Sequence, residues 1–124
     1  MTKTAGQYLS EANDMVERLS PDTAIPRHGD SNVVFVDVRD SKDIDQTGTI
    51  AGALRIPRGF IEFAADDSTS FHHPALTKDK EIMVVCAAGG MAALTGRTLR
   101  EMGYKHVYNV GGFNAWKEAG GPVE

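Results

Sequence analysis

Two short runs of aliphatic and β-branched residues constrain the fold of this chain most strongly. Residues 32–38 (NVVFVDV) and 82–85 (IMVV) are apolar over nearly every position, and turn-forming residues bound the first run. A strand with one face in water alternates apolar and polar residues, whereas a strand inside a parallel sheet is covered on both faces and is almost continuously apolar. We therefore expect both runs to be inner strands of a parallel sheet.

Helical patterns follow these strands along the chain. One apolar helix face begins directly after the second run and is made of Met91, Leu94, Thr95, Thr98, Leu99 and Met102, with Gly103 placed to end the helix. Shorter elements are expected as helical segments from Ser20 and over 59–65 and 113–119, and as strands over 54–56 and 107–110. Alternating strands and helices predict a three-layer α/β fold, with a parallel sheet between helices on both faces.

Residues 1–15 are expected to form a helical extension, with the main domain over residues 16–124. Apolar side chains recur at helical spacing in this segment, with polar residues between them: Tyr8, Leu9, Ala12, Met15 and Val16. The pattern indicates an amphipathic helix that packs either on its own domain or on a partner chain.

Composition excludes several classes of protein. Cys86 is the only cysteine, so the chain can form neither an internal disulfide nor a cysteine-only metal site, and its four histidines are scattered. The net charge of −4 argues against nucleic acid or an anionic membrane as the main partner. No apolar run suits a signal peptide or a membrane span, so we expect a cytoplasmic protein.

Cys86 lies where a strand ends and a helix follows. Ligands of open α/β sheets bind beyond the carboxyl ends of the strands. The small residues between Cys86 and the helix, Ala87, Ala88, Gly89 and Gly90, allow the backbone to curl and to point N–H groups inward. These amides and the helix N-terminus favour an anion, and the thiolate is the reactive form of cysteine. The alternative is that Cys86 is a small buried apolar residue that completes the strand.

Four stretches resemble the rhodanese-like (thiosulfate sulfurtransferase-like) family in their order and spacing. They cover about residues 16–123 and are residues 36–39 (VDVR), 48–57 (GTIAGALRIP), 85–91 (VCAAGGM) and 111–122 (GGFNAWKEAGGP). The resemblance implies five parallel strands, with residues 17–19 as an edge strand, in a single-domain protein. It implies no metal and no organic cofactor. The amphipathic N-terminal segment is compatible with either a monomer or a homodimer.

The resemblance also implies a mechanism. The Cys86 thiolate takes the outer sulfur of a donor such as thiosulfate, and the resulting persulfide passes that sulfur to a thiol or cyanide. We expect the donor or acceptor to be a small molecule or a partner protein. We expect neither a nucleic acid nor a membrane as a partner. The loop of Ala87, Ala88, Gly89, Gly90 and Met91 is expected to bind the sulfur anion through its amides.

The loop departs from the family pattern at several positions. Met91 stands where many members carry arginine, threonine or serine, and Ala87 and Ala88 stand where a dedicated thiosulfate enzyme has basic residues. The phosphatase branch of the fold has an arginine at the seventh loop position, which is Ala92 here. The loop therefore favours sulfur over phosphorus chemistry. A non-catalytic module that binds partners or senses oxidants remains the alternative.

Residues outside the loop complete the predicted site. Arg58 is the candidate to hold an anionic group of the donor, with Glu62 orienting it; the alternative is a surface ion pair of little energetic consequence. Asp37 and Arg39 are expected to form an internal pair that shapes the site. Thr49 replaces a histidine that the family usually carries, with a structural role.

Overall fold

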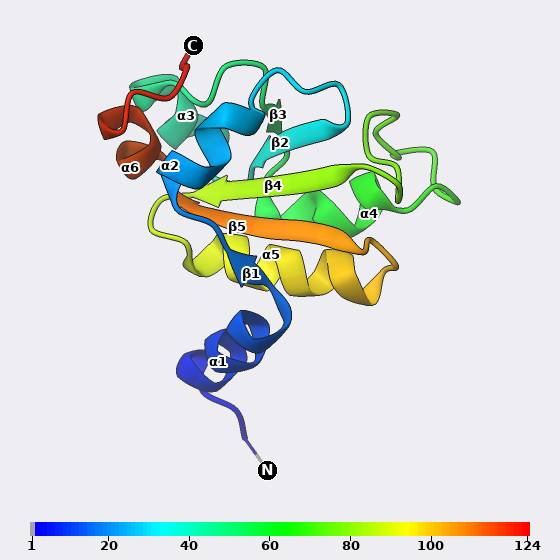
Figure 1. The fold of residues 1–124 in the computed structure, drawn as a ribbon. Coiled ribbons are helices and arrows are strands. Elements are labelled where there is room, and N and C mark those ends of the chain that lie inside the picture. The colour runs from blue at the N-terminus through cyan, green and yellow to red at the C-terminus, as the bar shows by residue number, and fades with distance from the viewer. Residues whose placement is uncertain (1) are drawn as a thin grey trace.

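One sheet of five strands forms the centre of the structure, a computed structural model that describes residues 2–124 (Figure 1). The strands lie in the order β1-β5-β4-β2-β3, and all neighbours run parallel. Their bounds are β1 Glu17–Arg18, β2 Val33–Asp37, β3 Leu54–Arg55, β4 Glu81–Cys86 and β5 His106–Gly112. The predicted fold class, the parallel sheet and the edge strand at residues 17–19 are confirmed.

Helices cover both faces of this sheet (Figure 1). One face carries α4 (Ile61–Ala65) and α5 (Gly90–Glu101), and the opposite face carries α2 (Pro21–Ala24), α3 (Ser41–Thr47) and α6 (Phe113–Glu118). Short 3-10 turns, Ile25–Arg27 and Arg58–Phe60, follow α2 and precede α4. The remaining helix, α1 (Ala5–Met15), lies outside α5.

The side chains of β4 show why the strand is apolar at consecutive positions. Ile82, Val84 and Cys86 point into the core beneath α4 and α5. Met83 and Val85 point into the core on the opposite face. All five are buried, as expected for a strand that is covered on both faces. Cys86 is thus the last residue of the most deeply buried part of the sheet.

Two features of the helices differ from the sequence-based expectation. No periodic pattern indicated α3, because this short helix buries only one residue, Ile44. The prediction of the apolar face of α5 was only partly correct, because Met91 is exposed and Leu94 is half-buried. The side chains that α5 buries are mostly small, namely Ala92, Ala93, Thr95, Gly96 and Leu99. A pattern of large apolar residues could not reveal a contact face made of small ones.

The predicted N-terminal extension is a helix that packs on α5 of the same chain. Thr4 caps α1 by accepting a hydrogen bond from the Gln7 amide, and Ala12 is fully buried. Glu11 forms an ion pair with Arg97 of α5 at 2.7 Å, and the Arg100 guanidinium donates to the Met15 carbonyl at 2.9 Å. Met1, the first residue of the predicted extension, lies outside the described residues. None of the helices in residues 2–124 is long and apolar enough to cross a membrane.

We predict that Glu11→Gln loosens α1 without unfolding the domain. Hydrogen bonds from Lys3 and Arg97 hold the pKa of Glu11 below its ordinary value. Their contribution is therefore present above the ordinary glutamate pKa of about 4.3 and is lost as the pH falls through the lowered value. Hydrogen exchange of the α1 amides at pH 7 should accelerate about two- to five-fold in Glu11→Gln. Asp14→Asn, an exposed change on the same helix, is the control; equal acceleration in both variants would contradict the tether.

Candidate active site

Cys86 lies at the carboxyl edge of the sheet with its thiol enclosed by the loop that follows. Only 2% of the residue is exposed. The sulfur accepts hydrogen bonds from the backbone amides of Gly89 at 3.0 Å and Ala92 at 3.3 Å. The Ala92 amide belongs to the first turn of α5, where N–H groups have no partner within the helix. Two backbone dipoles are therefore directed at the sulfur atom, an arrangement that favours a negative charge there.

Gly89 gives the loop its curl. Its φ of +104° lies in the left-handed region that side chains rarely adopt. A Cβ at this position would lie 2.5 Å from the Arg18 guanidinium, which packs against the back of the loop. Glycine therefore serves two purposes here: it turns the amide toward Cys86 and makes room for an arginine from the edge strand.

A bulge in β5 holds the loop from the neighbouring strand. The register between β4 and β5 shifts after Val84, so that Asn109 and Gly111 pair with consecutive residues of β4. The buried side chain of Asn109 donates to the Gly89 carbonyl at 2.9 Å and accepts from the Gly111 amide at 2.8 Å. Bulges beside active sites re-aim side chains in this way. Asn109 fixes the carbonyl of the same residue whose amide contacts the sulfur.

Gly112, the next residue along β5, lets the loop approach the strand. A Cβ on Gly112 would lie 2.3 Å from the Ala87 carbonyl oxygen, which is far inside normal contact distance. The backbone therefore requires glycine at both positions of the GG pair in the C-terminal motif. Gly111 has a φ of +84°, and Gly112 lies too close to the loop for a side chain. Trp116, from the same motif, is buried in the core and donates to the Pro122 carbonyl.

Asp37, the last residue of β2, forms a buried ion pair with Arg39, which lies just beyond the strand. The Arg39 guanidinium donates to the Asp37 carboxylate, at 2.7 Å for the shortest contact, and to the Gly48 carbonyl at 2.9 Å. Thr49 donates its hydroxyl to the same carboxylate at 2.7 Å. The guanidinium also lies 4.8 Å from the centre of the Phe113 ring. The network ties together β2, the segment before β3 and α6, and it borders a cavity of about 300 Å³ beside Ala87.

Arg58 lies on the other side of the loop. Its guanidinium contacts Glu62 at 3.3 Å and donates to the Thr98 hydroxyl of α5 at 3.1 Å. The predicted pair of Arg58 and Glu62 therefore exists, and Thr98 is an additional partner that sequence reasoning missed. At the loop itself, the side chains of Ala87, Ala88 and Met91 are exposed, whereas Gly89 is buried and Gly90 is half-buried.

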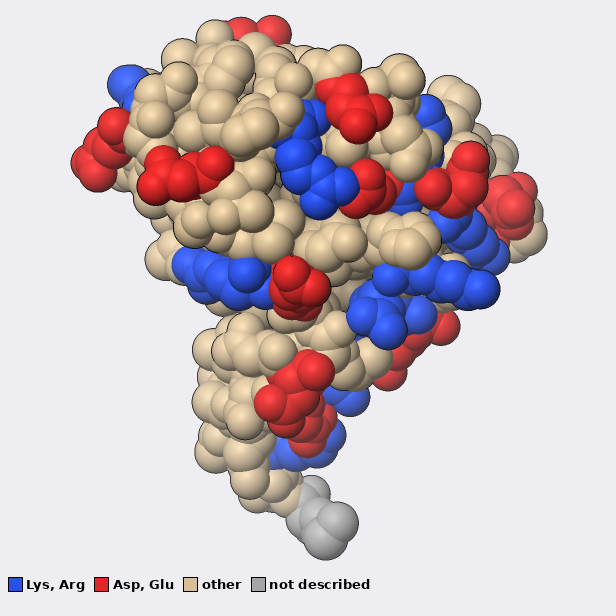
Figure 2. All heavy atoms as spheres, viewed as in Figure 1, with Lys and Arg blue, Asp and Glu red and all other residues tan. Residues whose placement is uncertain are grey.

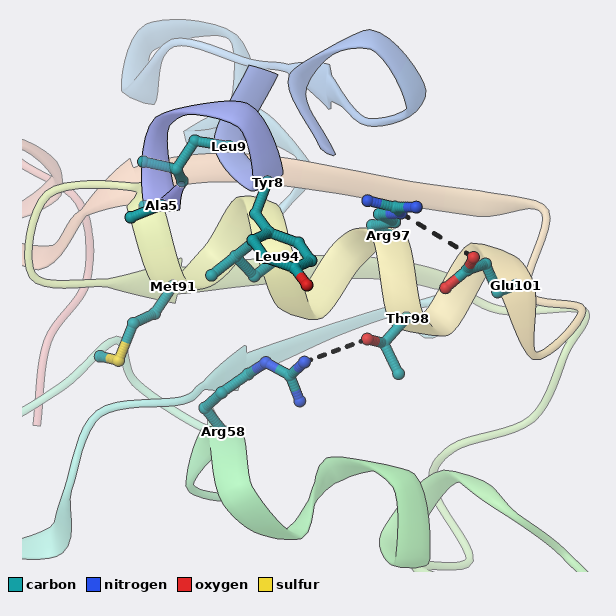
Figure 3. Close-up of a pocket in the computed structure, with 10 residues that line it drawn as sticks. Ala5, Tyr8, Leu9, Arg58, Met91, Leu94, Arg97, Thr98 and Glu101 are labelled. Atoms are coloured by element: carbon teal, nitrogen blue, oxygen red, sulfur yellow. Dashed lines mark hydrogen bonds and ion pairs between the residues drawn. The ribbon is translucent and has the colours of Figure 1, made fainter. Parts of the chain in front are cut away.

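A larger cavity of about 640 Å³ opens between α1 and α5 next to the loop (Figure 3). We call it the α1–α5 groove; its lining residues are Ala5, Tyr8, Leu9, Arg58, Gly90, Met91, Leu94, Arg97, Thr98 and Glu101. Figure 3 shows the Tyr8 ring of α1 beside Leu94 of α5, with Arg58 across the groove from α1. The loop around Cys86 thus has a mainly apolar cavity on one side and the smaller Arg39 cavity on the other.

Three residues that position the loop escaped sequence reasoning: Arg18, Asn109 and Gly112, of which only Gly112 belonged to a recognised motif. Arg18 and Asn109 act from β1 and β5, so their contacts with the loop depend on strand order. The sequence signal for these contacts was Asn109, a polar residue inside an otherwise apolar strand. Among residues 2–124, no group of three or more His, Cys, Asp or Glu side chains is arranged to hold a metal ion.

Comparison with known proteins agrees with this geometry. The sequence model of the family described as "Rhodanese-like domain" matches residues 20–119. The thiosulfate sulfurtransferase GlpE of Actinobacillus succinogenes is 30% identical over 107 residues, covering 86% of this chain and 88% of the relative. YrkF of Bacillus subtilis, named as a sulfur carrier protein, is 25% identical over 109 residues; the match covers 87% of this chain but only 54% of YrkF.

A solved structure is similar along the whole chain. It is a protein of unknown function from Rhodopseudomonas palustris, described as a possible tyrosine phosphatase, with a TM-score of 0.93 and 39% identity. The match covers 100% of this chain and 96% of that one. With a parallel sheet, a cysteine at the end of its central strand and a family match over most of its length, the chain belongs to the rhodanese-like domain family.

We predict that Asn109→Ala destabilises the domain and disturbs the site together. The change leaves the Gly111 amide without its partner and the Gly89 carbonyl with one partner fewer, at a cost of about 1–3 kcal/mol. Urea unfolding should report this loss, and alkylation of Cys86 by iodoacetamide should change several-fold because the Gly89 amide is no longer fixed. Asn114→Ala, an exposed change on α6, should alter neither. Loss of stability with an unchanged alkylation rate would show that Asn109 does not position the loop.

A second prediction concerns Gly112→Ala. The new Cβ meets the Ala87 carbonyl, so the loop or the strand has to move, at a cost of about 1–3 kcal/mol. The amide signals of residues 87–92 should shift in a nitrogen–proton correlation spectrum, while those of α1 stay in place. Gly59→Ala is the matched control, because a Cβ there has no neighbour within 4 Å. If the signals of residues 87–92 move no further in Gly112→Ala than in Gly59→Ala, the close-approach argument is contradicted.

Proposed function

We propose that the protein is a sulfurtransferase that carries a sulfane sulfur as a persulfide on Cys86. The observation that carries this proposal is the pair of backbone amides, from Gly89 and Ala92, that donate to the Cys86 sulfur. Preformed amide dipoles stabilise a thiolate before attack and a persulfide anion after it, without reorganisation during the reaction. Relatives named as a thiosulfate sulfurtransferase and a sulfur carrier support the same chemistry.

Each half-reaction breaks and forms one bond to sulfur. The Cys86 thiolate attacks the outer sulfur of thiosulfate; the new S–S bond forms as the old one breaks, and sulfite leaves with the electron pair. An acceptor thiolate then attacks the outer sulfur of the persulfide, and Cys86 leaves as a thiolate. No electron donor or acceptor outside the two substrates is needed, and the sequence of steps is that of covalent catalysis.

Arg58 is the candidate for binding the donor, and Asp37 and Arg39 for support of the site. Arg58 can direct a guanidinium toward the α1–α5 groove, where Glu62 and Thr98 hold it. Arg39 is held by Asp37 at the border of the smaller cavity and keeps the segment before β3 beside the loop. Both arginines lie at the carboxyl edge of the sheet, on opposite sides of the loop formed by residues 87–91.

The burial of Cys86 favours one other candidate function, a non-catalytic module that binds partners or senses oxidants. A thiol that is 2% exposed reacts only where the substrate reaches it through the loop. Phosphatase chemistry is not proposed, because the seventh loop position is Ala92, which contributes only its amide. The protein should therefore fail to hydrolyse p-nitrophenyl phosphate.

Intact mass after incubation with excess thiosulfate tests the proposed function. The native protein should gain about 32 Da, the mass of one sulfur atom held covalently. Cys86→Ser, the matched control, should gain nothing, and cyanide should return the loaded protein to its original mass. If thiosulfate, mercaptopyruvate and a protein persulfide all fail to load the native protein, the binding module becomes the better account.

A further inference from the structure

The α1–α5 groove is mainly apolar although it lies at the surface. Tyr8 and Met91 are large hydrophobic side chains that remain 47% and 39% exposed, and Leu9 and Leu94 also line the groove. The cavity of about 640 Å³ is in the range typical of small-molecule sites, which is about 300–1,000 Å³. Such sites combine an apolar lining with a few polar groups, here the hydroxyls of Thr98 and Tyr8.

The charged groups around the groove neutralise each other. Arg58 is paired with Glu62 at 3.3 Å. Arg97 is paired with Glu11 at 2.7 Å and with Glu101 at 3.8 Å. Figure 2 shows the same mixture of basic and acidic side chains across the face that it presents. An anionic ligand in the groove would compete with the carboxylates for these arginines, whereas an uncharged ligand leaves the pairs intact.

The groove adjoins the loop that encloses Cys86. Gly90 and Met91 belong both to the loop and to the groove lining. Leu9 of α1 reaches the loop: its Cδ2 lies 3.6 Å from the position that a Cβ on Gly90 would take. A molecule in the groove therefore lies next to the backbone that holds the sulfur.

One wall of the groove comes from outside the residues that match the family. The rhodanese-like match begins at residue 20, whereas Ala5, Tyr8 and Leu9 belong to α1. The extension therefore adds an apolar surface beside a site whose loop the rest of the domain provides. This placement puts α1 where it can contact a substrate of the site.

We propose that the α1–α5 groove binds the apolar body of an uncharged organic thiol, which accepts the sulfur from Cys86. This inference rests on the proposed function and names the class of its acceptor. The thiol sulfur bonds to the outer sulfur of the persulfide as the bond from that atom to Cys86 breaks. The acceptor attacks as its thiolate, and Cys86 leaves with the electron pair of the broken S–S bond and takes up the proton that the acceptor thiol released. The products are an organic persulfide anion and the Cys86 thiol.

The test is a series of straight-chain thiols as acceptors for the loaded protein. The value of kcat/KM should rise about two- to four-fold with each added methylene, because a buried methylene is worth about four-fold in binding. From ethanethiol to hexanethiol, which differ by four methylenes, the rise should be at least about sixteen-fold. The anionic thiol 3-mercaptopropionate should react more slowly than the uncharged butanethiol. A flat series, or a preference for the anionic thiol, would overturn the proposal.

Variants of the groove locate the effect. Tyr8→Ala removes an exposed ring and should lower the hexanethiol-to-ethanethiol ratio several-fold, and Tyr8→Ala with Leu94→Ala should lower it further. Phe63→Ala, which removes an exposed aromatic ring of α4 outside the groove lining, should leave the ratio unchanged. A chain-length preference that survives in the double variant would place the apolar site elsewhere.

A binding measurement separates this proposal from the proposed function. 1-Hexanol has the same apolar body and no thiol, so it reports on the groove even if Cys86 never carries sulfur. Titration should shift the methyl signals of Leu9 and Met91 in the native protein and much less in the double variant. Binding without persulfide formation would contradict only the sulfurtransferase. Persulfide formation without binding would contradict only the apolar acceptor site.

Discussion

The hydrogen bonds from the Gly89 and Ala92 amides to the Cys86 sulfur are the interaction on which the rest of the site depends. Each requires support from a different element. The Gly89 amide points inward because that residue is left-handed and because Asn109 holds its carbonyl. The Ala92 amide is available because α5 begins at Gly90, so its first turn has free N–H groups. The bulge in β5 and the close approach at Gly112 complete this arrangement.

Backbone dipoles, rather than a positively charged side chain of the loop, thus stabilise negative charge on the sulfur. The loop side chains are Ala87, Ala88 and Met91, which carry no charge. The nearby arginines, Arg39 and Arg58, are engaged with Asp37 and Glu62. Amide dipoles stabilise a single negative charge on sulfur, so the remaining charge of a donor such as thiosulfate falls to the proposed contact with Arg58. The apolar groove beside the loop is consistent with this balance, since it suits an uncharged substrate.

The sequence predicted the sheet because its signals were local. The continuous apolar runs of β2 and β4 identify strands that are covered on both faces, and the glycine-containing loop after Cys86 marks the start of α5. α3 was missed because a single buried residue, Ile44, gives no periodic pattern. The contact face of α5 was misjudged because small residues such as Ala92 and Gly96 form it.

The site was predicted less completely than the fold, because parts of it come from contacts between distant segments. Cys86 and its loop are continuous in sequence, and Arg58 and Glu62 are one helical turn apart. Asn109 and Arg18 reach the loop only because β5 lies next to β4 and β1 next to β5. The groove likewise needs α1 to pack on α5. Sequence patterns cannot specify which side of a short helix meets another one far along the chain.

A crystal structure of the protein after loading with thiosulfate tests the central claim most directly. The account predicts a second sulfur bonded to Cys86 Sγ, enclosed by the loop and within hydrogen-bond distance of amides in residues 87–92. The loop should keep the conformation described above, because its amides are already directed inward. An outer sulfur that points away from the loop, or a loop that has to rearrange to admit it, would contradict the preformed amide site.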